Sequence, residues 1–295
     1  MSTKKNIQKL FFISSMLIFS TVGVIRHYIP LPSGIISAFR GILGALTLAL
    51  ALLLLRKKLP THGIRKKLPL LILTGAFIGF NWMLLFESYN FTSIATATLC
   101  YYLAPSFVIL FSPLLLGEKL TPTKLLTLAL SLVGMVFVSG VFENGFSLMG
   151  KNIIGVLLAT GAALFYASVI LCNKKIEGVD SGTLTVIELF SAGLVIFPYA
   201  LFAERFSLSD FTPTVLLLLL LLGVVHTGIA YALYFGSLPH LPTTTVAILG
   251  YIDPIVAILL SALLLKEPFT LHTVIGAALI LGASILSDIQ KEPRE

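Results

Sequence analysis

One stretch of this chain occurs twice: YLAPSFVILFSPLLLGEKLT at residues 102–121 returns as YIDPIVAILLSALLLKEPFT at residues 251–270. Tyr102, Pro105, Glu118 and Thr121 all reappear in register, at an offset of 149 residues. A leucine-rich chain matches itself in places by composition alone, but shared Tyr, Pro, Glu and Thr are hard to obtain that way. The match predicts that the chain is an internal duplication.

The composition places both copies in lipid. Of 295 residues, 57% are hydrophobic and 11% are charged, and the mean hydropathy is +1.01. A soluble domain carries about 25% charged residues, so a soluble enzyme is excluded, and the wealth of apolar residues excludes a disordered chain. We expect an all-α polytopic membrane protein. Cys100 and Cys172 both fall in apolar segments, which indicates neither a disulfide framework nor a zinc site.

The apolar runs predict ten transmembrane helices, since each crossing needs about 20 residues. The first run follows Lys4, Lys5 and Lys9 but has no small-residue cleavage site after it, so we interpret it as a helix and not as a signal peptide. The expected ranges are 10–28, 33–55, 68–88, 92–115, 122–141, 152–172, 182–203, 212–236, 243–265 and 271–288.

The basic residues predict the orientation. The loop between the second and third helices holds the densest positive cluster, which marks a cytoplasmic loop under the positive-inside rule. Both termini are then cytoplasmic too, and Arg26, Lys151, Arg205 and Lys266 are the positive residues left outside. The cluster consists of Arg56, Lys57, Lys58, Arg65, Lys66 and Lys67.

Each copy of the duplication would hold five helices, residues 1–147 and 148–295. Because five is odd, the second copy enters the membrane from the opposite side, and the two form inverted repeats. Inverted repeats around a central cavity are a recurrent architecture of secondary transporters. Weaker matches support the division, including Ser33-Gly34 with Ser181-Gly182.

The duplicated stretch, together with Arg40 in the second helix, resembles the paired EamA domains of the drug/metabolite transporter superfamily. The resemblance covers essentially the whole chain, twice. It implies ten helices, a central cavity lined by helices one to four and six to nine, and peripheral fifth and tenth helices. Members move amino acids, nucleosides, cofactors, sugars, organic cations and drugs, so the resemblance does not name a substrate. The chain departs from the repeat at Lys266, where the first copy has Gly117.

Charged residues at membrane depth are expensive and mark candidate sites. Arg40 and Glu188 occupy equivalent places in the two repeats. They predict an amphoteric substrate site, with Arg40 for a carboxylate and Glu188 for an amine, although structural roles for both are equally open. Glu87 is expected near the outer end of the third helix.

Two candidates could couple transport to protons. Asp253 directly precedes Pro254, which removes a backbone hydrogen bond and kinks the ninth helix, as Pro105 does in the fourth. His226 has an ordinary pKa suited to proton exchange, and it is also a candidate for substrate binding. The alternatives are a hydrogen bond from Asp253 to the kinked backbone and a structural role for His226.

Aromatic and amide side chains complete the predicted cavity wall, where rings could stack on a planar substrate or hold a cation. The candidates are Asn81, Trp82, Tyr102, Tyr231 and Tyr251, and the repeat pairs Tyr102 with Tyr251 and Trp82 with Tyr231. Gly75 and Gly79 form a GxxxG pair for which we expect packing within the chain.

These features predict a secondary transporter that moves a small polar or amphipathic metabolite by alternating access, with export of an amino acid or related compound favoured. Exporters of organic cations or drugs, nucleoside or cofactor carriers, a channel, and a membrane-embedded enzyme on lipid substrates remain alternatives. We expect no catalytic residues, no cofactor, no metal and no nucleic-acid partner. We expect the protein to lie in a bacterial cytoplasmic membrane, as a monomer or a homodimer.

The sequence from Gly145 to Lys151 has the spacing of a phosphate-binding loop, but Asn152 replaces the Ser or Thr that binds magnesium.

Overall fold

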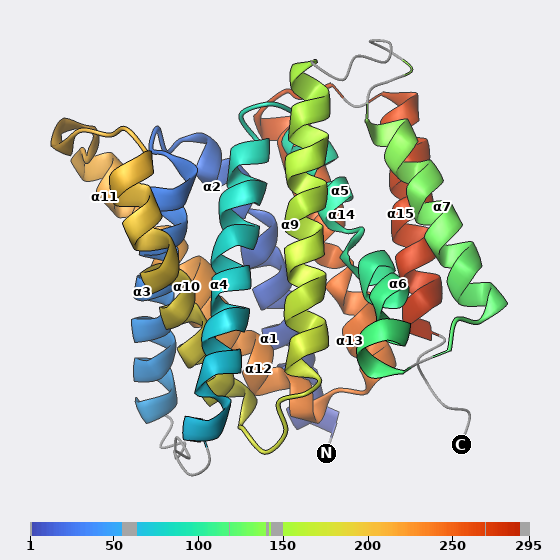
Figure 1. The fold of residues 1–295 in the computed structure, drawn as a ribbon, viewed down its shortest axis with the longest axis horizontal. Helices are drawn as coiled ribbons and strands as arrows, with labels where there is room; N and C mark the ends of the chain where they lie inside the picture. Colours follow the sequence, from blue (N-terminus) through green and yellow to red (C-terminus); the bar gives the residue numbers. More distant parts are fainter. Residues whose placement is uncertain are drawn as a thin grey trace.

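The chain forms a bundle of long helices, which run side by side along one direction (Figure 1). The structure is a computed structural model that describes residues 2–54, 64–117, 119–139, 142, 150–268 and 270–289. The regular secondary structure of these ranges is entirely helical, with no strand. An all-helical architecture is what lipid requires, because each helix satisfies its own backbone polar groups.

The first half begins with α1 (Ser2–Ser20) and α2 (Val22–His27), which are separated at Thr21, and continues through α3 (Ser33–Leu54) and α4 (Ile64–Ser88). The helices that complete it are α5 (Ile94–Tyr101), α6 (Ala104–Leu116) and α7 (Pro122–Val138). Sequence reasoning did not predict the interruption at Thr21, because no proline or glycine marks it.

The second half begins with α9 (Lys151–Asn173) and α10 (Ser181–Ala203). A continuous rod follows, made of α11 (Pro213–Leu220), the π-helix η2 (Leu221–Ile229) and α12 (Ala230–Ser237). The half ends with α13 (Thr243–Gly250), α14 (Ile252–Leu264) and α15 (Leu271–Ile289), and the short 3-10 turns η1 (Leu208–Asp210) and η3 (Leu238–His240) lie in its connections.

Seven helical segments in the described residues are long and apolar enough to cross a membrane, and three shorter apolar helices accompany them. All ten overlap the predicted ranges, and the all-α polytopic class is confirmed, while ten complete crossings remain a prediction. The outer surface carries many exposed apolar side chains, of which Phe202 is 90% exposed and Leu114 82%. Such a surface belongs in lipid.

The helix contacts made by one half recur when the two halves are interchanged. α3 packs against α10 on one side of the bundle, and α7 packs against α15 on the other side (Figure 1). α4 packs on α9 and α10, while the rod of η2 and α12 packs on α3 and α1. These contacts are those expected of two related halves. The predicted division between residues 147 and 148 lies outside the described residues.

Glycines let several of these helices approach closely. A Cβ added to Gly41 would lie 2.7 Å from the backbone nitrogen of Gly193, where α3 crosses α10. Gly75 and Gly79 pack against α10 within the same chain, in the manner expected from their spacing.

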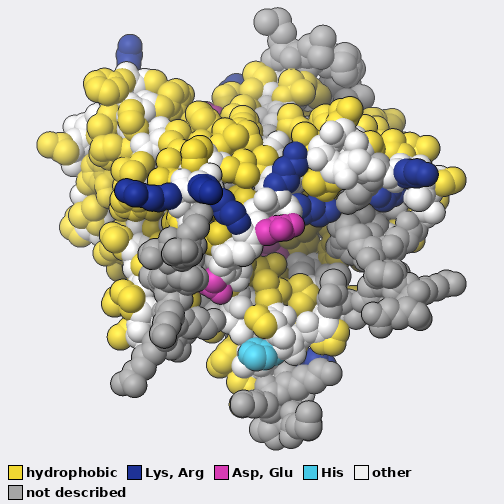
Figure 2. Space-filling view, turned by 60° about the horizontal axis from the view of Figure 1, so that its bottom comes forward, with side chains coloured by type: hydrophobic (Ala, Val, Ile, Leu, Met, Phe, Trp, Pro, Cys, Tyr) yellow, Lys and Arg dark blue, Asp and Glu magenta, His cyan; other side chains and the backbone are white. Residues whose placement is uncertain are grey.

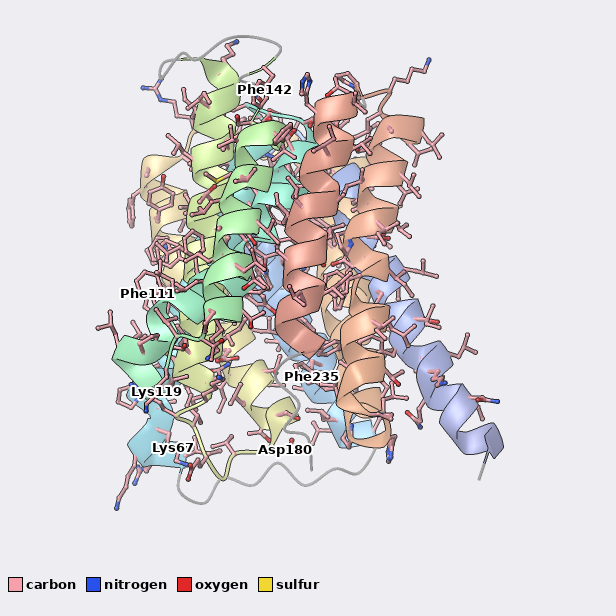
Figure 3. The ribbon with its side chains drawn as sticks, turned by 90° about the vertical axis from the view of Figure 1, so that its right-hand side faces the viewer. Lys67, Phe111, Lys119, Phe142, Asp180 and Phe235 are labelled. Atoms are coloured by element: carbon pink, nitrogen blue, oxygen red, sulfur yellow. The ribbon has the colours of Figure 1, made fainter. Side chains whose placement is uncertain are left out.

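α1 begins and α15 ends at one end of the bundle, at the bottom of Figure 1, which we call the terminal end. Figure 3 shows Lys67, Lys119 and Asp180 at that end and Phe142 at the opposite end. In Figure 2 the terminal end comes forward and shows Lys and Arg side chains spread across it, with a few acidic groups between them. Arg56, Lys57 and Lys58 of the predicted basic cluster lie outside the described residues.

Candidate functional site

Two broken helices meet in the middle of the bundle. α5 ends at Tyr101 and α13 ends at Gly250, each four residues before the proline of the following helix, Pro105 or Pro254. A proline has no N–H for the carbonyl four residues earlier, so each helix stops where that bond is lost. Across the gap, the Tyr102 hydroxyl donates to Oδ2 of Asp253 at 3.0 Å. The repeat therefore brings both breaks together.

Arg40 lies on α3 with 5% of its surface exposed. The centre of its guanidinium group lies 4.1 Å from the centroid of the Trp82 ring and 5.6 Å from that of Phe86. Its Nε donates to Oγ1 of Thr227 at 2.9 Å. Among the described residues no carboxylate pairs with Arg40, although Asp253 is close enough for its charge to act on it. Within the described residues, the two Nη groups of Arg40 make no hydrogen bond.

The π-helix η2 places Thr227 against Arg40. Its side chain donates to the carbonyl of Leu222, five residues earlier. In the neighbouring position, Nδ1 of His226 contacts the carbonyl of Leu221 at 3.0 Å, and Nε2 contacts Oγ1 of Thr21 at 2.8 Å. His226 is thus tied to the interruption between α1 and α2.

This π-helix follows from one extra residue in the second repeat. Gly75 matches Gly223 at an offset of 148, but Gly79 matches Gly228 at an offset of 149. Gly223 and Gly228 pack on α3 as Gly75 and Gly79 pack on α10. A spacing of five in place of four keeps both glycines on one face if the turn widens to a π-bulge, a feature often found at functional sites. Sequence reasoning missed Thr227 and the bulge, although the change of offset was a signal for both.

Tyrosines surround the space between these groups. The ring of Tyr101 lies 5.6 Å from that of Tyr166 and 6.3 Å from that of Tyr102. Tyr166 lies within electrostatic range of Tyr231 and Asp253, which belong to other helices, yet 41% of its surface is exposed. Exposed surface on a side chain that faces several inner helices indicates accessible space between them. Tyr101 and Tyr166 are not among the cavity-wall residues selected above from the sequence.

Three other predicted residues make no hydrogen bond to Arg40. Asn81 is 1% exposed, and its Nδ2 donates to the carbonyl of Ala162 at 2.6 Å, so it joins α4 to α9. Tyr251 is 7% exposed and lies in the break between α13 and α14. Glu188 is 3% exposed on α10.

At the opposite end, a buried polar network ties three helices. Arg26 donates to Oγ of Ser33 at 3.2 Å, and Ser33 donates to Oε2 of Glu87 at 2.7 Å. Nδ2 of Asn90 also donates to Glu87, at 3.1 Å. Glu87 thus lies at the end of its helix, as predicted, and links α3 to the end of α4.

Two further carboxylates cap helices from the other half of the chain at the same end. Glu204 accepts from the N–H groups of Gly34 and Ile35 at 2.8 and 3.0 Å, at the start of α3. Its partial burial raises the pKa of its carboxyl above the ordinary value, although the two N–H groups oppose that effect.

Glu267 caps α5 in the same way, accepting from the N–H groups of Ile94 and Ala95 at 2.9 and 3.3 Å. The matching Glu118 lies outside the described residues. An acidic group at a helix N-terminus is stabilised by the unpaired N–H groups and the helix dipole. Together the two caps hold the halves together at the opposite end.

Two hollows of the described surface are lined by residues other than the predicted substrate residues. One, of about 350 Å³, is an apolar groove between α4 and α10 that includes Ile72 and Phe190. The other, of about 500 Å³, lies at the opposite end and is lined by Glu87, Asn90 and Glu204. The central space is therefore inferred from the exposed tyrosine surface.

The chain matches the model of the EamA-like transporter family twice, over residues 7–140 and 153–287. It is 28% identical to the uncharacterized transporter YxxF of Bacillus subtilis, over 99% of this chain and 92% of that protein. It is 29% identical to protein PecM of Dickeya dadantii, over 80% of this chain and 77% of that protein. A solved crystal structure, 18% identical, aligns over 97% of both chains with a TM-score of 0.64, which shows a shared fold.

Proposed function

The chain belongs to the EamA-like transporter family, and from this premise we propose that it is a secondary carrier that exports an amino acid or a related small amphipathic metabolite by alternating access. The family and the multi-pass apolar helices make it a membrane transporter. The substrate class, the direction of movement and the mechanism belong to the proposal.

The observation that supports the substrate class is that Arg40 is buried and has no carboxylate partner among the described residues. A buried guanidinium with no carboxylate partner is expensive in a membrane, and its planar donors suit the carboxylate of a ligand. Asp253 supplies the opposite charge nearby, held by the Tyr102 hydroxyl. An amino acid carries both complementary charges, and the tyrosine rings offer apolar surface for its side chain.

The position of Asp253 also favours a second candidate, an organic cation. The carboxylate lies within electrostatic range of Tyr102, Tyr166 and Tyr231. Aromatic faces together with a carboxylate attract cations. A ligand of this kind would use Asp253 without Arg40.

A two-stage experiment tests the function. Purified protein is first screened by thermal unfolding against the common amino acids, nucleosides and the organic cation tetraphenylphosphonium, since a ligand that binds the folded state raises its stability. Compounds that stabilise it are then tested for uptake into proteoliposomes. We expect saturable uptake with counterflow, and we expect Arg40→Ala to lose it for amino acids.

The outcomes separate the candidates. Transport of tetraphenylphosphonium that requires Asp253 but not Arg40 would support the organic-cation carrier. Flux that neither saturates nor counterflows would contradict a carrier and favour a channel. Turnover of a lipid without flux would support the membrane-embedded enzyme.

For the setting of the protein, we infer a bacterial cytoplasmic membrane with both termini in the cytoplasm. The lysines of the terminal end, where α1 begins and α15 ends, support this orientation. The partners we propose are the small-molecule substrate and the lipid bilayer, with a monomer or a homodimer as the assembly.

A further inference from the structure

Glu188 is a buried acid that the substrate site does not use. It lies two turns inside α10, about 10 Å from the start of the helix at 1.5 Å per residue, and only 3% of its surface is exposed. Its backbone carbonyl lies under Gly75, where an added Cβ would come within 2.6 Å. The side chain is therefore enclosed by packed helices.

The polar neighbours of Glu188 come from two other helices. Thr74 of α4 and Asn173, the last residue of α9, are the side chains whose hydrogen-bonding groups face its carboxylate. The Thr74 hydroxyl donates to the carbonyl of Leu71 at 3.0 Å, so its one hydrogen is already used.

Two acceptor atoms in this pocket lack a donor. Oε1 of Glu188 and Oδ1 of Asn173 are both buried and make no hydrogen bond. Buried polar atoms of native proteins are almost always hydrogen-bonded, and an exception requires an explanation. The amide of Asn173 presents an N–H donor to the carboxylate, but a neutral amide leaves the charge of the carboxylate uncompensated.

No cation compensates that charge within the described residues. From α3, Arg40 faces Trp82 and Thr227, and α4 offers the neutral Thr74. The titratable groups within electrostatic range are Cys172 and Tyr166 of α9 and Tyr231 of α12, all of which are neutral in their ordinary state. Lys175 acts on Cys172, at the edge of this group.

We propose that Glu188 is a proton-binding site, in which the proton is held on Oε1, the buried carboxyl oxygen that has no donor. A proton on this oxygen removes the buried charge. Asp253 differs, because it already accepts a hydrogen bond from Tyr102.

The location gives this proton a role in transport, which rests on the proposed function. Glu188 and Asn173 lie toward the terminal end, between α4, α9 and α10. Separation of these helices when the terminal end opens would hydrate the carboxylate and release the proton there. Proton binding would then favour the packed state, and proton release would favour the open state. Protonation of Glu188 is thereby coupled to the opening of the terminal end.

Infrared spectroscopy of the purified protein tests the protonation without any substrate. At pH 7 we expect a C=O stretching band of a protonated carboxylic acid that is absent in Glu188→Gln. The control Glu177→Gln, at an exposed loop carboxylate, should retain the band, and Asp253→Asn identifies any contribution of Asp253. An unchanged band in Glu188→Gln overturns the proposal.

The same variant tests the packing argument. Glutamine resembles the neutral acid in size and charge, so Glu188→Gln should fold with an unfolding temperature no lower than that of the native chain. Glu188→Ala should unfold at a lower temperature, because it leaves a cavity between packed helices. Failure of Glu188→Gln to fold would also contradict a neutral Glu188.

The coupling is measured in proteoliposomes with radiolabelled phenylalanine and tetraphenylphosphonium as probes. We expect Glu188→Gln to retain counterflow at above half the native rate. An imposed pH gradient should stimulate its transport at least tenfold less than it stimulates that of the native protein. Equal stimulation of both proteins overturns the coupling. If neither probe is transported by the native chain, the proposed function fails for these probes, while the infrared result still decides the protonation.

Discussion

Three contacts together orient the guanidinium group of Arg40 without neutralising its charge. The Trp82 ring lies on one face of the guanidinium, Phe86 is farther away, and Thr227 accepts from Nε. A cation over an aromatic ring gains about 0.5–2 kcal/mol, depending on solvent exposure. That energy holds the group in place and leaves its outer edge for a carboxylate.

Replacing this residue tests the site. We expect Arg40→Ala to lower amino-acid transport at least tenfold, since a hydrogen bond to a charged group contributes about 1.5–3 kcal/mol and about 1.4 kcal/mol corresponds to tenfold. Arg40→Lys should restore part of the activity, because it keeps the charge but not the planar donors. Initial uptake rates in proteoliposomes provide the measurement.

Stability separates a binding role of Arg40 from a structural one. We expect the unfolding temperature of Arg40→Ala to change little, because removal of an unpaired buried charge offsets the lost contacts with Trp82 and Thr227. A large fall in that temperature, or native transport rates in the variant, would contradict the assignment.

At the level of elements, the link between α14 and α15 contains a strained residue. Lys266 has φ 54°, in the left-handed region, and the matching Gly117 has φ 71° at the end of α6. The repeat thus preserves the backbone turn after it has lost the glycine, and the turn leads directly into Glu267, the cap of α5. A non-glycine residue in this conformation loses about 1–2 kcal/mol.

Restoring glycine should relieve that strain. We expect Lys266→Gly to raise the free energy of unfolding by about 1 kcal/mol, and Lys266→Ala, which also removes the charge but retains a Cβ, to give no such gain. Thermal unfolding of the three proteins in one detergent is the measurement. Equal stabilities of the glycine and alanine variants would contradict the strain.

The Glu204 cap of α3 predicts a pH dependence. Burial raises the pKa of this carboxyl in the folded state, so the folded chain holds the proton more tightly than the unfolded chain does. The stability that this group contributes is therefore present at low pH and is lost as the pH rises above the ordinary pKa of 4.5.

Glu204→Gln removes this titration while keeping an oxygen acceptor. Measured over a pH series, the unfolding temperature of the native chain should fall relative to that of Glu204→Gln as the pH rises from 4.5. If the two curves of unfolding temperature against pH run parallel, Glu204 has the same pKa in the folded and the unfolded chain. If the native chain gains stability relative to Glu204→Gln as the pH rises, the pKa is lowered by folding, which contradicts the prediction.

For the whole molecule, the packing of each half repeats in the other, and the links between them gather at the end opposite the termini. Glu204 joins α10 to α3 there, and Glu267 joins α14 to α5. Two halves that exchange such contacts could give two conformations of similar energy, which alternating access requires.

The orientation is tested by labelling single cysteines with a membrane-impermeant maleimide in intact cells. In a background with Cys100 and Cys172 replaced by alanine, Lys151→Cys at the opposite end should react from outside, while Lys67→Cys at the terminal end should react only after lysis. The reverse pattern would invert the assigned topology.

The sequence by itself determined the membrane class, the position of the helices and the internal duplication, because these depend on local hydropathy and on matched residues along the chain. It also indicated the breaks near Pro105 and Pro254, since a missing N–H acts within one helix turn. Arg40 and Asp253 could be selected as candidates because charge is rare at membrane depth.

Only the tertiary structure decided which of those candidates meet. It brought Asp253 to Tyr102, and Thr227 to Arg40 through the extra residue of a π-helix. Among the described residues, it left Glu188 beside Asn173 and without a cation. Asn81, equally plausible by sequence, serves to join α4 to α9. Partners of a buried polar group come from distant helices, so their identity depends on helix rotation and packing, which hydropathy along the chain does not specify.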